Sequence, residues 1–116
     1  MAYDEGLAER IRACLDGRRD VVEKKMFGGL TFMVGGHMAC GVLKDQLVLK
    51  VGDELYEAVV TRPHARPMDF TGKPMRGMVY VAPAGYKNAA TLRTLVDLAV
   101  GQAESQPAQA KKTKRR

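Results

Sequence analysis

The 116-residue sequence predicts an α+β domain: an antiparallel sheet of four to five strands with N-terminal, short central and C-terminal helices packed on it. Three observations carry this prediction. Apolar residues recur at helical spacing near both ends of the chain, a period of two dominates the middle, and glycines punctuate that middle. With 46% apolar residues, a chain of this length can bury one hydrophobic core.

The first predicted element is a helix over residues 3–16. Leu7 and Ile11 recur at helical spacing, and charged residues occupy the opposite side. Gly17 ends the helix, because glycine is the usual residue just past a helix C-terminus. We interpret residues 18–23 as a charged connection.

A glycine-punctuated block over residues 24–42 predicts a central hairpin. Gly35 and Gly36 supply the positive φ that a two-residue hairpin turn needs. Residues then pair outward from the turn, with a period of two along each strand. The predicted pairs are Val34 with His37, Met33 with Met38, Phe32 with Ala39, Thr31 with Cys40, and Leu30 with Gly41. Large side chains thus lie opposite small ones, and both faces of the hairpin are fairly apolar, which favours cover on both sides.

A third strand over residues 47–51 follows a short turn, and so tight a connection makes these three strands antiparallel. Asp53 is expected to cap a short helix over residues 54–60. Residues 61–67 are irregular in this interpretation, since two prolines remove backbone donors.

The remaining elements are one or two strands and a helix. A strand over residues 78–82 is the fourth of the sheet, a brief strand over residues 68–70 would be the fifth, and residues 71–74 form a turn between them. Asn88 caps a final helix that ends near Ala103. The apolar stripe of this helix consists of Leu92, Leu95, Val96 and Ala99.

Neither cysteine belongs to a recognisable catalytic or metal-binding pattern. Cys14 falls on the first helix and Cys40 on a strand, so we expect two reduced thiols and no disulfide scaffold. His37 lies three positions before Cys40, which directs the two to opposite faces of a strand and prevents shared metal coordination. The seven methionines are expected to fill gaps beside the glycines. The sequence therefore predicts no cofactor, no metal and no catalytic residues.

The richest polar stretch lies between residues 62 and 76. Its candidate contacts to an anion or a partner are Arg62, His64, Arg66, Lys73 and Arg76. Two interpretations stay open: these loops converge into a site, or they form a solvated face. A small-ligand-binding or enzymatic domain that uses this stretch is the alternative to an interaction module.

Most of the net charge of +6 belongs to the last six residues. The cations there are Lys111, Lys112, Lys114, Arg115 and Arg116, and they leave residues 1–110 with a net charge of +1. Because the segment before them lacks large apolar residues, we expect a disordered basic tail over residues 104–116, after a domain over residues 1–103. Such a tail either adds weak, non-specific, salt-dependent contacts to nucleic acid or serves only solubility.

No apolar run approaches the roughly 20 residues that a membrane-spanning helix needs. The acidic N-terminus also lacks the features of a signal peptide. We therefore expect a cytoplasmic protein with no membrane segment. A homodimer formed through an open sheet edge is compatible with this pattern.

Two blocks of the sequence carry a family resemblance. The first begins with Lys25-Met26-Phe27-Gly28-Gly29 and continues to Gly41. The second is Phe70 followed by Gly72-Lys73-Pro74-Met75-Arg76-Gly77-Met78-Val79-Tyr80-Val81, ahead of the closing helix. Together they resemble the TfoX N-terminal domain, the family of TfoX/Sxy competence regulators, over roughly residues 5–100. The resemblance implies a small bacterial cytoplasmic α+β domain.

The resemblance also implies regulation instead of catalysis. Named members of the family promote expression of DNA-uptake genes as coactivators with the cyclic-AMP receptor protein, and the family supplies no catalytic residues. We therefore expect a non-enzymatic interaction module that contacts a protein partner such as a transcription regulator. Those regulators carry a further C-terminal helical domain, whereas this chain is expected to be a stand-alone N-terminal domain.

Overall fold

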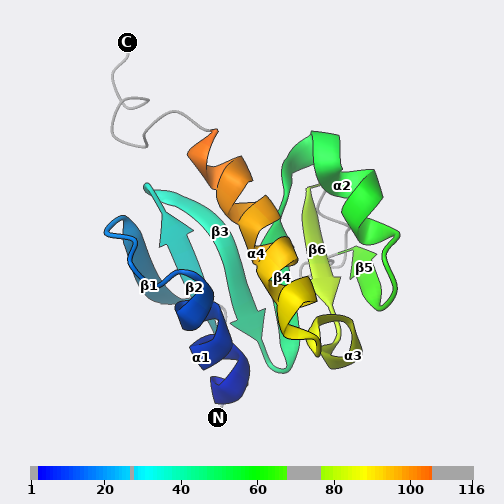
Figure 1. Ribbon diagram of the computed structural model, residues 1–116, viewed down its shortest axis with the longest axis horizontal. Helices are drawn as coiled ribbons and strands as arrows, with labels where there is room; N and C mark the ends of the chain where they lie inside the picture. Colours follow the sequence, from blue (N-terminus) through cyan, green and yellow to red (C-terminus); the bar gives the residue numbers. More distant parts are fainter. Residues whose placement is uncertain (1–2, 27, 68–76, 106–116) are drawn as a thin grey trace.

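The computed structural model describes residues 3–26, 28–67 and 77–105. Within them, six strands form one antiparallel sheet in the order β1-β2-β3-β4-β6-β5 (Figure 1). The strands are β1 (Val21–Met26), β2 (Gly29–Val34), β3 (His37–Leu43), β4 (Gln46–Lys50), β5 (Ala65–Pro67) and β6 (Met78–Val81). The helices are α1 (Glu5–Cys14), α2 (Gly52–Val60), α3 (Pro83–Tyr86) and α4 (Ala89–Glu104). The predicted α+β class is confirmed, with six strands in place of four to five.

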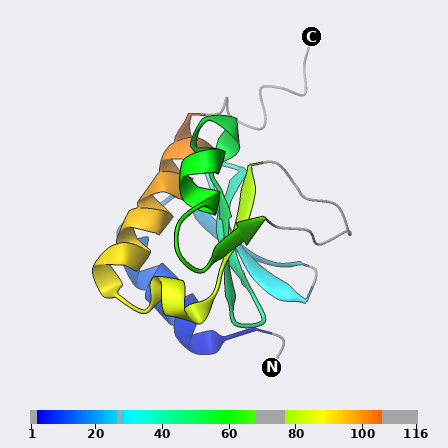
Figure 2. The same cartoon turned by 90° about the vertical axis from the view of Figure 1, so that its right-hand side faces the viewer.

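The helices lie on one side of the sheet, so the domain has two layers (Figure 2). The core between the layers combines one face of each helix with alternate residues of the strands. Its helical side chains include Leu7, Ile11, Val59, Leu92, Leu95 and Val96, and its strand side chains include Leu30, Phe32, Val34, Val42, Leu47, Leu49, Val79 and Val81. None of the described helices is both long and apolar enough to cross a bilayer.

Side-chain caps set the starts of the two end helices. The Asp4 carboxylate accepts a hydrogen bond from the Leu7 amide at 3.0 Å, so α1 begins two residues later than predicted. The Asn88 side chain accepts from the amides of Ala90 and Thr91 at 2.8 and 3.1 Å. The predicted cap and apolar stripe of α4 are confirmed.

The sequence-based interpretation of residues 18–23 as a connection is wrong, because β1 begins at Val21. This strand lies at the edge of the sheet, where Glu23, Lys24 and Lys25 are exposed on both faces. An edge strand of this kind shows no apolar alternation, which removes the usual sequence signal. Its backbone pairing with β2 reveals the strand.

The predicted hairpin turn is confirmed, and the register beyond it is wrong. Gly35 and Gly36 have φ of +61° and +89°, and the first two pairs are those predicted. A bulge between Phe32 and Met33 then leaves Ala39 as an extra residue on β3. Past the bulge the pairs are Phe32 with Cys40, Thr31 with Gly41, and Leu30 with Val42.

Three further elements differ from the prediction. Helix α2 begins at Gly52, and its N-cap residue Val51 makes no side-chain cap hydrogen bond, so Asp53 lies inside the first turn instead of capping it. Strand β5 falls within residues 61–67, which were expected to be irregular; Pro67 is tolerated because β5 is the other edge of the sheet. The strand and turn predicted over residues 68–74 lie outside the described residues.

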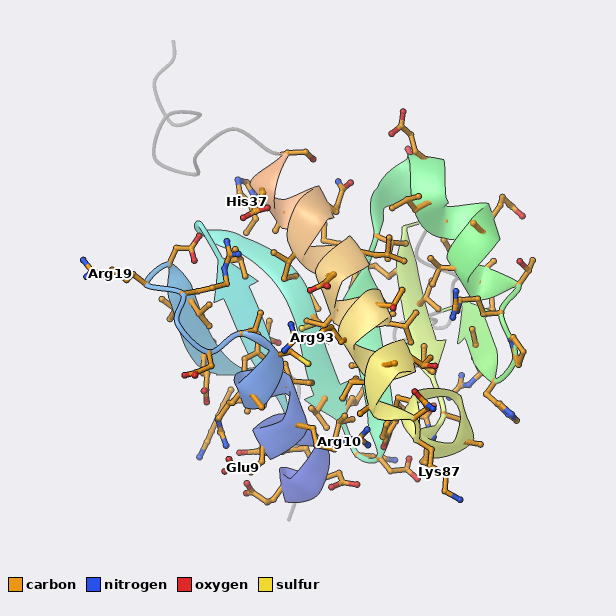
Figure 3. The ribbon with its side chains drawn as sticks, viewed as in Figure 1. Glu9, Arg10, Arg19, His37, Lys87 and Arg93 are labelled. Atoms are coloured by element: carbon orange, nitrogen blue, oxygen red, sulfur yellow. The ribbon has the colours of Figure 1, made fainter. Side chains whose placement is uncertain are left out.

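Helix α3 is a single turn that the sequence pattern did not predict. Its Tyr86 is buried, and the phenol hydroxyl donates to the Asp45 carbonyl at 2.8 Å. From α1, the Arg10 guanidinium donates to the carbonyls of Tyr86 and Lys87 at 3.0 and 3.1 Å (Figure 3). These bonds connect the turn to the sheet and to α1.

Candidate functional site

One row of side chains crosses all six strands on the sheet face opposite the helices. The row consists of Lys24, Thr31, Gly41, Val48, Tyr80 and Arg66, each directly opposite the next. Directly opposed residues of antiparallel strands share a face, so these residues lie on one face of the sheet. We call it the helix-free face.

The row has basic ends and an apolar centre. Val48 and Tyr80 are only 4% and 6% exposed, and they pack with the buried Met78. Above this cluster, the Arg66 guanidinium lies 4.5 Å from the centroid of the Tyr80 ring. A cation at this distance from an aromatic face is attracted by the ring quadrupole. Arg66 is therefore held in place at one end of the row.

The charged strand residues of the helix-free face are all basic. Alternation along the described strands places Lys24, Lys50 and Arg66 there, and it places no aspartate or glutamate. Sequence reasoning missed that Lys24 and Lys50 share one face of the sheet, because this depends on the order and register of the strands. The arrangement suits contact with an anionic partner.

The structure describes three of the five residues predicted to contact an anion or partner. Arg62, His64 and Arg66 are all exposed on β5 and the loop before it. His64 has a φ of +67°, which is uncommon for a residue with a side chain. Lys73 and Arg76 lie outside the described residues, as do the five cations predicted for the tail. A site at this stretch stays a prediction.

Ion pairs fix the edge strand β1 to the first helix. The Arg12 guanidinium donates to both carboxylate oxygens of Glu23 at 2.8 and 2.9 Å and to Glu9 at 2.8 Å. The hydrogen bond from Arg12 lowers the pKa of Glu23. Pairs this exposed add little stability, but a bidentate pair fixes geometry. Glu23 is therefore both positioned and neutralised on β1.

The two cysteines lie at different depths. Cys40 is fully buried, and burial raises the pKa of its thiol to about 12. Cys14, the last residue of α1, is half-buried; burial raises the pKa of its thiol, and the positive charge of Arg93 on α4 opposes that shift. Because only a thiolate is strongly nucleophilic, the surroundings of Cys40 do not favour attack on a substrate.

The predicted separation of His37 and Cys40 onto opposite faces is wrong. The bulge at Ala39 adds one residue, so both lie on the helix-covered face, opposite Val34 and Phe32. They are still three steps apart along the strand, which separates their Cα atoms by about 10 Å, too far for two ligands of one ion. Among the described residues, no group of three or more His, Cys, Asp or Glu side chains could hold a metal ion.

The burial of Cys40 predicts a specific thiol reactivity. At about pH 9, where an exposed thiol is largely ionised, Ellman's reagent should modify Cys14 slowly and Cys40 only after denaturation. A Cys14→Ser variant isolates the second thiol and should be inert until unfolded. Rapid modification of native Cys14→Ser would show that Cys40 is accessible and would contradict its placement.

The described residues define a small two-layer α+β domain, with helices on one face of an antiparallel sheet and basic residues on the other. The chain belongs to the TfoX N-terminal domain family, which matches residues 13–103. No curated protein and no solved structure matches the chain.

Proposed function

We propose that this protein is a non-enzymatic interaction module that regulates transcription, including expression of DNA-uptake genes, through contact with a protein partner in the cytoplasm. Membership of the TfoX N-terminal domain family carries this proposal. The exposed basic residues Lys24 and Arg66 of the helix-free face add positions that an anionic partner could contact. The basic tail supplies at most weak additional contacts to nucleic acid.

A deletion experiment tests this function. Removal of the gene from the native host should change the transcript levels of DNA-uptake genes several-fold, and the wild-type chain supplied in trans should restore them. In-cell crosslinking through the restored chain should recover one protein reproducibly. Unchanged transcripts together with no reproducible crosslinked protein would overturn the proposal.

A further inference from the structure

Strand β1 presents an open backbone edge. Among the described residues it pairs only with β2, and the opposite edge strand β5 has three residues and ends in a proline. The Gly35 amide donates to the Asp20 carbonyl at 3.0 Å, so these two opposed residues form a hydrogen-bonded pair. Hydrogen-bonded and non-hydrogen-bonded pairs then alternate along β1 and β2. The backbone groups of Val22 and Lys24 then point to β2, whereas those of Val21, Glu23 and Lys25 point outward.

An apolar row also ends at this edge. Val22 lies opposite Met33, and Met33 lies opposite Met38, all on the helix-free face. The Val22 side chain is 54% exposed, the largest exposed fraction among the large hydrophobic residues described. An apolar side chain on an added strand would continue this row, and methionine adapts well to varied partners.

The charge of the edge specifies its partner. Lys24 and Lys25 are exposed, and neither forms an ion pair within the described part of the chain. Glu23 is neutralised by Arg12, so the edge is positive on both faces. Lysines on an edge strand deter uncharged strands, and they favour a strand that carries carboxylates.

The same charges disfavour a second copy of this chain. Two copies could pair antiparallel through β1 to form one continuous sheet with the helices of both copies on the same side. Each residue of β1 must then lie opposite a residue whose side chain is on the same face. The two registers that pair most of β1 bring two such positive edges together, and one of them places Lys24 directly opposite Lys24. Like charges directly opposite each other destabilise a sheet.

We propose that β1 binds an extended acidic segment of a protein partner, which adds to the sheet as a further strand. This inference rests on the interaction function proposed above and names its surface and the chemistry of the partner. Main-chain hydrogen bonds to Val21, Glu23 and Lys25 supply the affinity, and the side chains supply the selectivity. The segment carries acidic residues opposite Lys24 and Lys25 and an apolar residue opposite Val22.

A synthetic peptide probes this edge directly. Its core has two glutamates followed by threonine, valine and isoleucine, which lie opposite Lys25 to Val21 in an antiparallel strand. The peptide is added at concentrations up to about 1 mM, and binding is monitored by amide hydrogen exchange in NMR spectra. The amides of Val21, Glu23 and Lys25 should gain protection, whereas those of Val22 and Lys24 already bond to β2 and should not change.

Matched variants separate the contribution of the backbone amide to peptide binding from that of the side-chain charge. Lys25→Pro and Lys25→Ala lose the same charge, but the proline also removes an outward amide, so only Lys25→Pro should abolish binding. Lys24→Glu should weaken binding about tenfold. Lys87→Glu also replaces a lysine by a glutamate, but beside α3 and away from β1 (Figure 3), so this variant should not weaken binding.

Each alternative outcome overturns the inference. Equal binding of a peptide with lysines in place of the glutamates would remove the charge selectivity. Protection of the same amides at high protein concentration without peptide would identify a second copy as the occupant, and protection by single-stranded DNA would identify nucleic acid. If no peptide binds while crosslinking still recovers a partner, strand addition fails but the proposed interaction function survives.

Discussion

Gly41→Ala is expected to lower the free energy of unfolding by about 3 kcal/mol. A Cβ atom at this position would lie 2.6 Å from the Leu30 carbonyl oxygen and 3.3 Å from the Thr31 Cα atom. Both neighbours belong to the backbone of β2, which cannot move away without disturbing its ladder with β3. The close approach of two strands therefore requires glycine here.

Chemical denaturation of the wild type and two variants measures this effect. Gly101→Ala is the matched control, because Gly101 lies at an exposed position of helix α4 and an added Cβ atom meets nothing within 4 Å. That variant should gain about 0.5–1 kcal/mol from the higher helix propensity of alanine. The same chemical change should thus have opposite signs at the two sites. A Gly41→Ala protein as stable as the wild type would disprove the close approach.

The parts of the fold that bury a regular apolar pattern could be predicted from the sequence. Helix α4 combines a capping Asn88 with a stripe that is buried throughout, β4 has a buried apolar run over residues 47–49, and all four residues of β6 are buried. The turn at Gly35-Gly36 has a chemical signature of its own. In these segments local preference and tertiary environment agree.

The missed features arise where pairing, not pattern, decides the structure. Strand β1 is charged because it lies at an edge, and nothing in a single sequence says that it pairs with β2. The bulge at Ala39 depends on how the β2–β3 ladder twists, and small alanine fits either register. One extra residue was enough to reverse the inferred facing of His37 and Cys40.

The candidate surface was harder to predict than the fold. Its residues come from all six strands, and Lys24 and Arg66 become ends of one row only because β1 and β5 are the two outer strands. Sequence reasoning favoured the polar stretch after residue 61, where charges cluster along the chain. A sheet instead brings together side chains from strands that are distant in the sequence. The density of charged residues along the chain is therefore a poor guide to which residues share a face of the sheet.

The second large effect is expected at the centre of the core, where Phe32→Ala should cost about 3–5 kcal/mol. Phe32 is fully buried and is the largest of the fully buried side chains described. It points from β2 into the layer between the sheet and the helices. Small domains are stable by only about 5–15 kcal/mol, so this loss could leave little of the native state.

Two further variants show whether the loss comes from the cavity. Phe32→Leu keeps most of the apolar volume and should cost clearly less than Phe32→Ala, because the cost of a cavity grows with its volume. Val22→Ala, one strand away on the opposite face and 54% exposed, should change stability by less than about 1 kcal/mol. Unfolding is measured by denaturant titration, with the slope compared between variants. Equal losses for Phe32→Ala and Val22→Ala would mean that β2 does not direct Phe32 into the core, and the observed register of β1, β2 and β3 would be wrong with it.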